Sequence, residues 1–369
     1  MASLGSSPLI IDSHIHLYPS SELHTLAWLT PNSGSPLDGQ HSVSDYLSAV
    51  IPPSSTPRSS LRGFVFVETD RKHDLLTQDF ESPLLEISWI SRIAQGLPRP
   101  GEGHSAPHAP LVLGIVPWAP LPLGPQVLDK YISQALEVAG PSAALIRGFR
   151  YLVQDKPPKT MLSAQFISSL TRLGEQDYVF DVGVDLHRQS WQGPELISMI
   201  QAAHSGLASR DKVVFVIDHI AKPDMTVIQR DENDLMHTPS FAAWKHTIQE
   251  LAMFEKVYIK LSGCFSEMNP EILGAEGEEC ETQRLTQEEE YEAVEPWLSV
   301  ALEAFGPQRC MFGSDWPVCE ANPVGREAWG RWKGIVRRMC EDKKLTDAQR
   351  RRIWEGTAVE AYGLKIAEM

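Results

Sequence analysis

The sequence has little positive charge and no cluster of basic residues. Its 369 residues include 33 Lys and Arg against 48 Asp and Glu, which gives a formal net charge of -15 at pH 7. Such an acidic chain repels phosphate backbones, so we expect no nucleic-acid partner. A pocket inside an acidic protein can still be locally basic, so a small anionic substrate is allowed.

Long apolar runs and an export signal are also lacking. The N-terminal stretch MASLGSSPLII has neither the basic segment nor the long apolar core of a signal peptide. No apolar run is long enough to cross a bilayer. We therefore expect a cytoplasmic protein with no membrane partner.

Cysteines are few and scattered. The five are Cys264, Cys280, Cys310, Cys319 and Cys340, and no two of them form a CxxC pair. This spacing argues against a cysteine zinc site and against a disulfide framework. We expect reduced thiols.

No glycine-rich phosphate loop follows any apolar run, which disfavours an open, doubly wound nucleotide-binding sheet. The sequence has instead eight short runs rich in Val, Ile and Phe that do not alternate with polar residues. Such runs are typical of parallel strands buried on both faces. Amphipathic segments follow most of them, so the pattern predicts a (β/α)8 TIM barrel. The runs are 9–16, 63–70, 111–118, 144–151, 178–185, 212–224, 256–263 and 309–317.

We expect residues 1–369 to form a single TIM-barrel domain with three loop insertions. Residues 30–42 and 97–110 are rich in Gly, Pro and Ser, and residues 269–290 are acidic. The acidic stretch follows the seventh expected strand. It is therefore either a lid over the barrel mouth or a solvated insertion.

Polar side chains come directly after three of the expected strands. The first strand ends in His14 and His16, the sixth in His219 followed by Lys222, and the eighth in Asp315. Residues two apart on a strand point to the same side, so both histidines can face the barrel mouth, where TIM barrels carry their active sites. Further polar residues near strand ends are Glu68, Arg147, Arg150, His187 and Lys260.

Three imidazoles and one carboxylate make a suitable ligand set for a single Zn²⁺ with one position open to water or substrate. The expected ligands are His14, His16, His219 and Asp315. Zinc would lower the pKa of its bound water to about 7 and so supply hydroxide at neutral pH. Asp315 would bind the metal, accept the water proton, or do both.

Four motifs, IDSHIH, DHIAKPD, KLSG and MFGSDWPV, occur in an order that resembles the amidohydrolase-related family, often called amidohydrolase 2. The segments RGFRYLVQD and EAFGPQRCMFGSDWPV are similar to its branch of sugar-acid lactonases, which includes rhamnono-, fucono- and pyrone-dicarboxylate lactonases. The resemblance extends from Ile11 to Leu364. It implies a TIM barrel and a hydrolase that opens a sugar-acid lactone, with L-rhamnono-γ-lactone or a related aldonolactone as the expected small-molecule substrate.

The resemblance also implies residue roles. His14 and His16 match the first-strand pair, His219 matches the catalytic His of the sixth-strand motif, and Asp315 matches the last-strand acid and general base. The fourth expected strand contains no Lys that could form a carbamylated bridge, so a two-metal site is not expected. Some members of this branch work without a metal, in which case Asp315 activates water and the histidines polarise the carbonyl. The metal-bound and metal-free versions use the same residues and both stay open.

A lactone is an activated cyclic ester, and its hydrolysis needs only water, a base and a polarised carbonyl. The candidate substrate-binding residues are Arg150, Lys222, Glu68, Arg147, Trp316 and His187. Arg150 matches an Arg of the family motif and is preferred over Arg147, because residues an odd number apart on a strand point to opposite sides. Two other hypotheses are a metal-dependent decarboxylase of an unsaturated or aromatic acid and a barrel that binds without catalysis.

Overall fold

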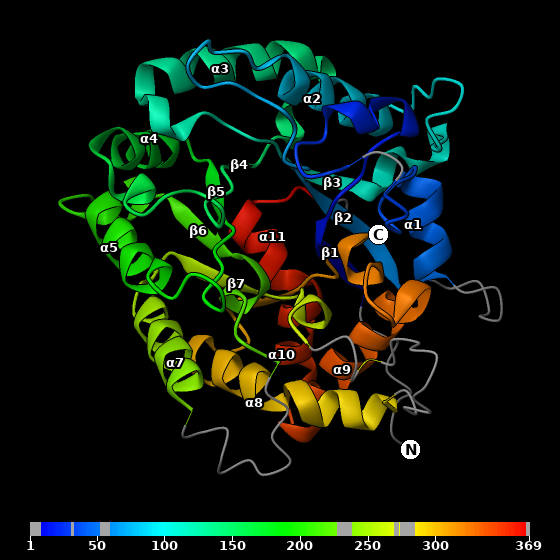
Figure 1. The fold of residues 1–369 in the computed structure, drawn as a ribbon, viewed down its shortest axis with the longest axis vertical. Helices are drawn as coiled ribbons and strands as arrows, with labels where there is room; N and C mark the ends of the chain where they lie inside the picture. The colour runs from blue at the N-terminus through cyan, green and yellow to red at the C-terminus, as the bar shows by residue number, and fades with distance from the viewer. Residues whose placement is uncertain are drawn as a thin grey trace.

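The computed structural model describes residues 9–30, 33–51, 60–226, 238–268, 273 and 285–366. Within these ranges eight short strands alternate with helices (Figure 1). Each strand overlaps one of the predicted runs, so that prediction is confirmed. The strands are β1 (Ile10–Ile15), β2 (Leu61–Val67), β3 (Val112–Val116), β4 (Gly148–Arg150), β5 (Val179–Val182), β6 (Val214–Ile217), β7 (Val257–Leu261) and β8 (Cys310–Phe312).

All neighbouring strands run parallel, in the sequential order of a barrel. Strands β1 to β3 form one sheet and β4 to β8 a second. Isolated bridges join the two sheets at both seams. Between β3 and β4 the Arg147 N–H donates to the Ile115 carbonyl at 3.0 Å, and between β8 and β1 the His16 N–H donates to the Trp316 carbonyl at 2.7 Å. These bonds complete the ring of strands that the predicted TIM barrel requires.

The inside of the barrel is apolar toward its N-terminal end. Buried Ile11, Val65 and Val216 pack there against residues of the C-terminal helix α11 (Thr357–Tyr362). Arg147, which precedes β4, donates from its Nε to the Tyr362 carbonyl at 2.7 Å. Helix α11 therefore covers the N-terminal end of the barrel and leaves the opposite end for the site.

The outer helices surround the strands, as Figure 1 shows, and the larger apolar core lies between the two layers. Side chains of Ser163, Thr238 and Thr286 cap the starts of α4, α7 and α8 by accepting a backbone N–H three residues further on. The outer helices are α1 (Val43–Val50), α2 (Glu81–Ala94), α3 (Pro125–Ala139), α4 (Ala164–Glu175), α5 (Gln192–His204), α7 (Pro239–Ala252), α8 (Gln287–Phe305), α9 (Ala328–Asp342) and α10 (Asp347–Arg351).

The three expected insertions are described to different extents. Residues 97–110 include most of a 3₁₀ helix (Ala106–Leu111), and an ion pair between Arg92 and Glu102 fastens the insertion to α2. Residues 33–42 lead into α1, whereas most of 269–290 lies outside the described residues, so its role as a lid or a solvated insertion stays a prediction. The single-domain organisation also stays a prediction. Among the described residues, no helix has the length and apolar character needed to cross a membrane.

Candidate active site

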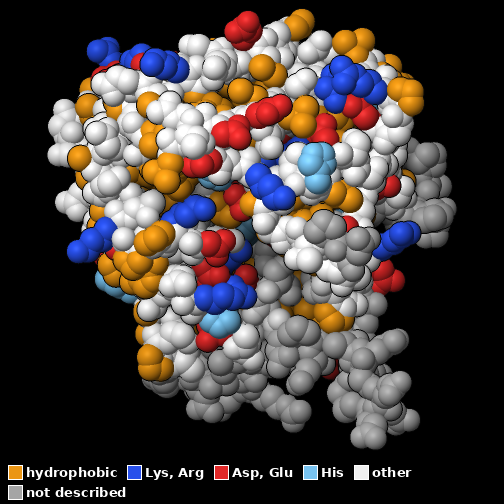
Figure 2. Space-filling view, turned by 45° about the horizontal axis from the view of Figure 1, so that its top comes forward, with side chains coloured by type: hydrophobic (Ala, Val, Ile, Leu, Met, Phe, Trp, Pro, Cys, Tyr) orange, Lys and Arg blue, Asp and Glu red, His pale blue; other side chains and the backbone are white. Residues whose placement is uncertain are grey.

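A cavity of about 250 Å³ opens at the carboxyl ends of the strands, and Figure 2 shows charged side chains of both signs around a hollow on one face of the molecule. Its lining contains both ionisable and apolar side chains. Ionisable residues of the lining include His16, Asp70, Arg150, Asp218, His219, Lys222 and Asp315. Apolar and aromatic residues of the lining are Tyr18, Trp28, Leu37, Leu152, Pro317 and Val318.

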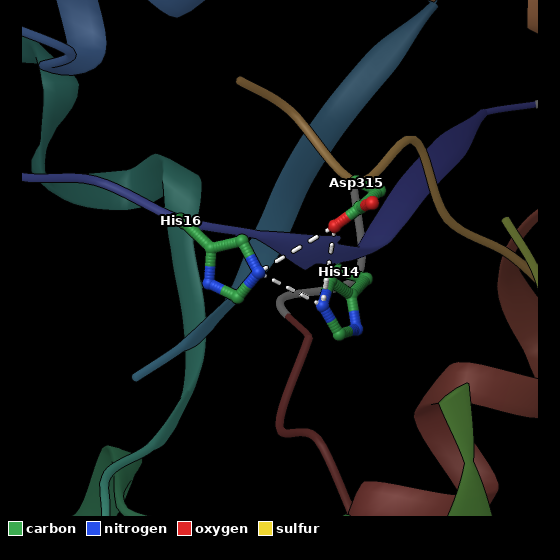
Figure 3. A group of neighbouring side chains, drawn as sticks. All are labelled: His14, His16 and Asp315. Atoms are coloured by element: carbon green, nitrogen blue, oxygen red, sulfur yellow. Dashed lines mark hydrogen bonds and ion pairs between the residues drawn. The ribbon is translucent and has the colours of Figure 1, made fainter. Parts of the chain in front are cut away.

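Two strands bring three potential metal ligands together (Figure 3). The Nε2 atoms of His14 and His16 lie 3.1 Å apart, and Asp315 Oδ1 lies 3.6 Å from the first and 3.5 Å from the second. Ligands about 2.0–2.2 Å from a tetrahedral ion are about 3.3–3.6 Å apart. The three donor atoms therefore already have nearly the spacing of three corners of a metal-binding tetrahedron.

The fourth expected ligand lies beside this group. His219 Nε2 is 3.6 Å from Asp315 Oδ1. Donor atoms of His14, His16 and Asp315 all lie within 4.8 Å of one another, whereas His219 groups in the same way with His14 and Asp218. The structure thus brings all four predicted residues to one place, with His219 at its edge.

Hydrogen bonds fix the histidine rings. His16 Nδ1 lies 2.9 Å from the Val67 carbonyl, which only accepts, so this nitrogen carries the proton and Nε2 offers a lone pair. His219 Nδ1 is 2.9 Å from Ser262 Oγ. The Val67 carbonyl orients the His16 ring and raises the basicity of its Nε2, whereas the Ser262 hydroxyl, which can donate or accept, orients the His219 ring in either tautomer.

The backbone around the site is strained. His219, Ile220, Ala221 and Lys222 all have positive φ, between 44° and 61°, and Asp315 has a φ of 64°. These values are costly for residues other than glycine, most of all for the β-branched Ile220. Such strain is found where the surrounding structure holds functional side chains in place.

Burial and neighbouring charges set the protonation states of the site. Burial lowers the pKa of His219 to about 4, against the opposing effect of Asp315. Burial and the charge of Lys260 lower the pKa of His14 well below its usual range. Burial alone raises the pKa of Asp315, but the neighbouring imidazoles, His219 first, outweigh it and lower this pKa. At neutral pH these histidines are neutral and Asp315 is ionised, which are the forms that bind metal.

Two predicted substrate residues reach the cavity. The Lys222 ammonium donates to Gln154 Oε1 at 2.9 Å at the cavity wall. Arg150 donates from Nε to Glu68 Oε1 at 2.6 Å and from a second nitrogen to the Glu68 carbonyl at 2.7 Å. Glu68 is fully buried and is not part of the cavity lining, so it lies behind Arg150 and holds its guanidinium.

Three other predicted residues are not part of the cavity lining. Arg147 lies at the opposite end of β4, against α11. Trp316 is buried, and its indole N–H donates to Glu320 Oε1 at 2.9 Å. His187 Nε2 is 3.3 Å from Asp224 Oδ1. The structure gives none of these three a place in the cavity wall.

Sequence reasoning did not assign a role to Asp218 or Lys260, although both directly adjoin His14. Asp218 precedes His219 in the motif DHIAKPD and lines the cavity. Lys260 is fully buried inside the barrel. A charged residue inside an otherwise apolar strand run is the signal that could have pointed to it.

Comparison with known proteins agrees with this geometry. A family model described as amidohydrolase matches residues 108–364, and this chain belongs to that family. The chain is 32% identical over 361 residues to an L-rhamnono-gamma-lactonase of Scheffersomyces stipitis, covering 96% of this chain and 98% of that protein. It is 31% identical over 255 residues to an L-fucono-1,5-lactonase of Burkholderia multivorans, covering 69% and 72% respectively.

A solved structure extends the likeness to the fold. The crystal structure of an amidohydrolase from Burkholderia multivorans with bound Zn has a TM-score of 0.67 and 25% identity to this chain, covering 97% of this chain and all of that one. The (β/α)8 fold and the family predicted from the motifs are thereby confirmed. The His and Asp donors of this chain form a site suited to a divalent metal.

Proposed function

We propose that this chain hydrolyses a sugar-acid lactone by attack of water on the ester carbonyl. The observation that carries the proposal is the meeting of His14, His16, His219 and Asp315 beside a cavity that also presents the cation of Lys222. The printed names of the two relatives, one of them matched over nearly its whole length, support the same reaction.

The donor set fits a divalent metal, and we propose Zn²⁺ held by His14, His16 and Asp315, with His219 beside it. When bound, zinc acidifies a water ligand to a pKa of about 7 and polarises a carbonyl oxygen. The zinc in the similar Burkholderia structure favours the metal-bound version over the metal-free one.

Asp315 takes the proton of the attacking water as the new C–O bond forms. When the ring C–O bond of the tetrahedral intermediate breaks, the same carboxyl returns a proton to the leaving ring oxygen. His219 lines the cavity next to Asp315, so a proton on its Nε2 can bond to the carbonyl oxygen as negative charge develops there. These two residues are the proposed catalytic pair.

Arg150 and Lys222 bind the hydroxyls of the sugar acid, and Glu68 keeps the Arg150 guanidinium in position. The apolar part of the lining, which includes Tyr18 and Leu152, suits the carbon skeleton of the substrate. We propose L-rhamnono-γ-lactone, or an aldonolactone closely related to it, as the substrate, because the relative matched over 98% of its length carries that name.

The test is a panel of aldonolactones followed by proton release in weak buffer, with wild-type protein and the variants Asp315→Asn and Asp177→Asn. Asp177 is an exposed residue with positive φ, where Asn fits well, so its variant controls for loss of a carboxylate. Asp315→Asn should lower kcat by about 100-fold or more, the usual size of a general-base effect, while Asp177→Asn stays at the wild-type rate.

Two results would contradict the proposal. Absence of hydrolysis across the panel, with CO₂ released from an unsaturated or aromatic acid, would make the protein a decarboxylase. Full activity after prolonged chelation, with metal content measured near zero, would refute the zinc part while leaving the lactonase standing.

A further inference from the structure

A buried column of charged and polar side chains runs through the barrel beneath the candidate site. The Tyr362 hydroxyl of α11 donates to Asp181 Oδ1 at 2.7 Å, and the Lys260 ammonium lies 2.7 Å from Asp181 Oδ2. The same ammonium lies 3.0 Å from Asp218 Oδ1 and 2.9 Å from His14 Nδ1. Lys260 is fully buried, does not line the cavity, and has no part in the proposed reaction.

The contacts form one self-consistent chain of hydrogen bonds. Lys260 has only donors, so His14 Nδ1 accepts from it and the proton of the neutral His14 ring is on Nε2. That proton faces His16 Nε2 at 3.1 Å, which is free to accept because His16 Nδ1 donates to the Val67 carbonyl. In this arrangement His14 Nε2 donates to His16 Nε2. The two Nε2 atoms therefore do not both offer a lone pair to a shared ion.

Asp218 supports this arrangement. Its buried Oδ1 lies 3.1 Å from His14 Nδ1 as well as 3.0 Å from the Lys260 ammonium, so it is within reach of both. It is placed to accept a proton from His14 Nδ1 once that nitrogen no longer accepts from Lys260.

We propose that Lys260 is a positioning residue that favours the metal-free pairing of His14 with His16 and thereby weakens the binding of a divalent cation there. This inference rests on the proposed metal site. For His14 to become a ligand, its proton must move from Nε2 to Nδ1. The Nδ1–H then donates to Asp218 Oδ1, and Nδ1 no longer accepts a hydrogen bond from the Lys260 ammonium. The ammonium also repels a cation bound on the other side of the His14 ring.

The experiment measures zinc affinity by competition with a chromophoric chelator, so lactone hydrolysis plays no part in it. Lys260→Met should bind Zn²⁺ at least tenfold more tightly than the wild type. Lys256→Met, which removes the same charge just before β7, should stay within about twofold of wild type. Equal or weaker binding by Lys260→Met would overturn the proposal, because a residue that merely supports the site would weaken zinc binding when removed.

Removing Lys260 leaves two buried carboxylates without their cation, so a second variant guards against misfolding. Lys260→Met with Asp181→Asn removes one charge of each sign and should show the same gain in zinc affinity.

A third readout uses the wild type alone. Two-dimensional ¹H–¹⁵N spectra of histidine-labelled protein should place the His14 proton on Nε2 without metal and on Nδ1 with zinc. A proton on Nδ1 in the metal-free protein would refute the proposal whatever the variants do.

Discussion

Gly263 supports His219 from behind, and replacing it with alanine tests the geometry of the site directly. Gly263 follows β7 with a φ of 70° and a ψ of 2°, a left-handed conformation that costs other residues about 1 kcal/mol. A Cβ at this position would lie 2.6 Å from both Cγ and Nδ1 of the His219 ring. The ring has little freedom to retreat because its backbone is itself left-handed and its Nδ1 is 2.9 Å from Ser262 Oγ.

The expected loss combines two terms. Overpacking against a fixed ring costs about 1–3 kcal/mol, so Gly263→Ala should lower the free energy of unfolding by about 2–4 kcal/mol in all. A displaced His219 should also lower kcat/KM by about 100-fold, since shifts near 1 Å in a catalytic group have effects of that size.

The matched control is Gly206→Ala. Gly206 has a φ of 73° and an added Cβ would meet no heavy atom within 4 Å, so it carries the conformational cost without the clash. Urea unfolding should show a loss of about 1 kcal/mol, with lactone hydrolysis unchanged. If Gly263→Ala matched this control in both stability and kcat/KM, the proposed contact between Gly263 and the His219 ring would be wrong.

Three further predictions concern the charged groups. His219 has a folded pKa of about 4 against about 6.5 when unfolded, so about 3 kcal/mol of stability should be lost as pH falls from 6.5 to 4, and urea titrations should find the total loss over this range smaller by about that amount in His219→Gln. Arg150→Met should cost about 3–5 kcal/mol in the same assay by stranding buried Glu68, and adding Glu68→Gln should recover much of it; no recovery would contradict the pairing. Lys222→Ala should lower kcat/KM by about 10- to 100-fold without loss of stability, and unchanged kinetics would show that Lys222 does not bind substrate.

Much of the fold was predictable because parallel barrel strands are buried on both faces and therefore appear as uninterrupted apolar runs. The lengths of the strands were less predictable. The run 144–151 forms a strand only at Gly148–Arg150, because a 3₁₀ helix (Gly140–Leu145) occupies its beginning. Its apolar residues are buried in either conformation, so composition alone does not separate the two.

The candidate site was also predictable only in part. His14, His16, His219 and Asp315 were identifiable because each follows or ends a strand, and barrel topology brings strand ends together. The partners behind them were not. The contact between Asp181 and Lys260 joins two strands separated by β6, so it follows from the barrel's curvature and from side-chain length rather than from any spacing in the sequence. Trp316 also comes just after a strand, but that position did not reveal that its side chain is buried and hydrogen-bonded to Glu320.

The last seam of the barrel and the candidate site are made by the same residues. At the β8–β1 seam the Asp315 N–H donates to the His14 carbonyl at 2.9 Å, and the His16 N–H donates to the Trp316 carbonyl at 2.7 Å. The three side chains with metal-ligand spacing therefore belong to the backbone segments that join the first strand to the last, about 300 residues apart in the sequence. Half a barrel contains either the histidine pair or the aspartate, but not both, so the ligand set forms only when the barrel closes. A cation held by these three side chains would bind only the closed barrel and so would stabilise this seam by mass action.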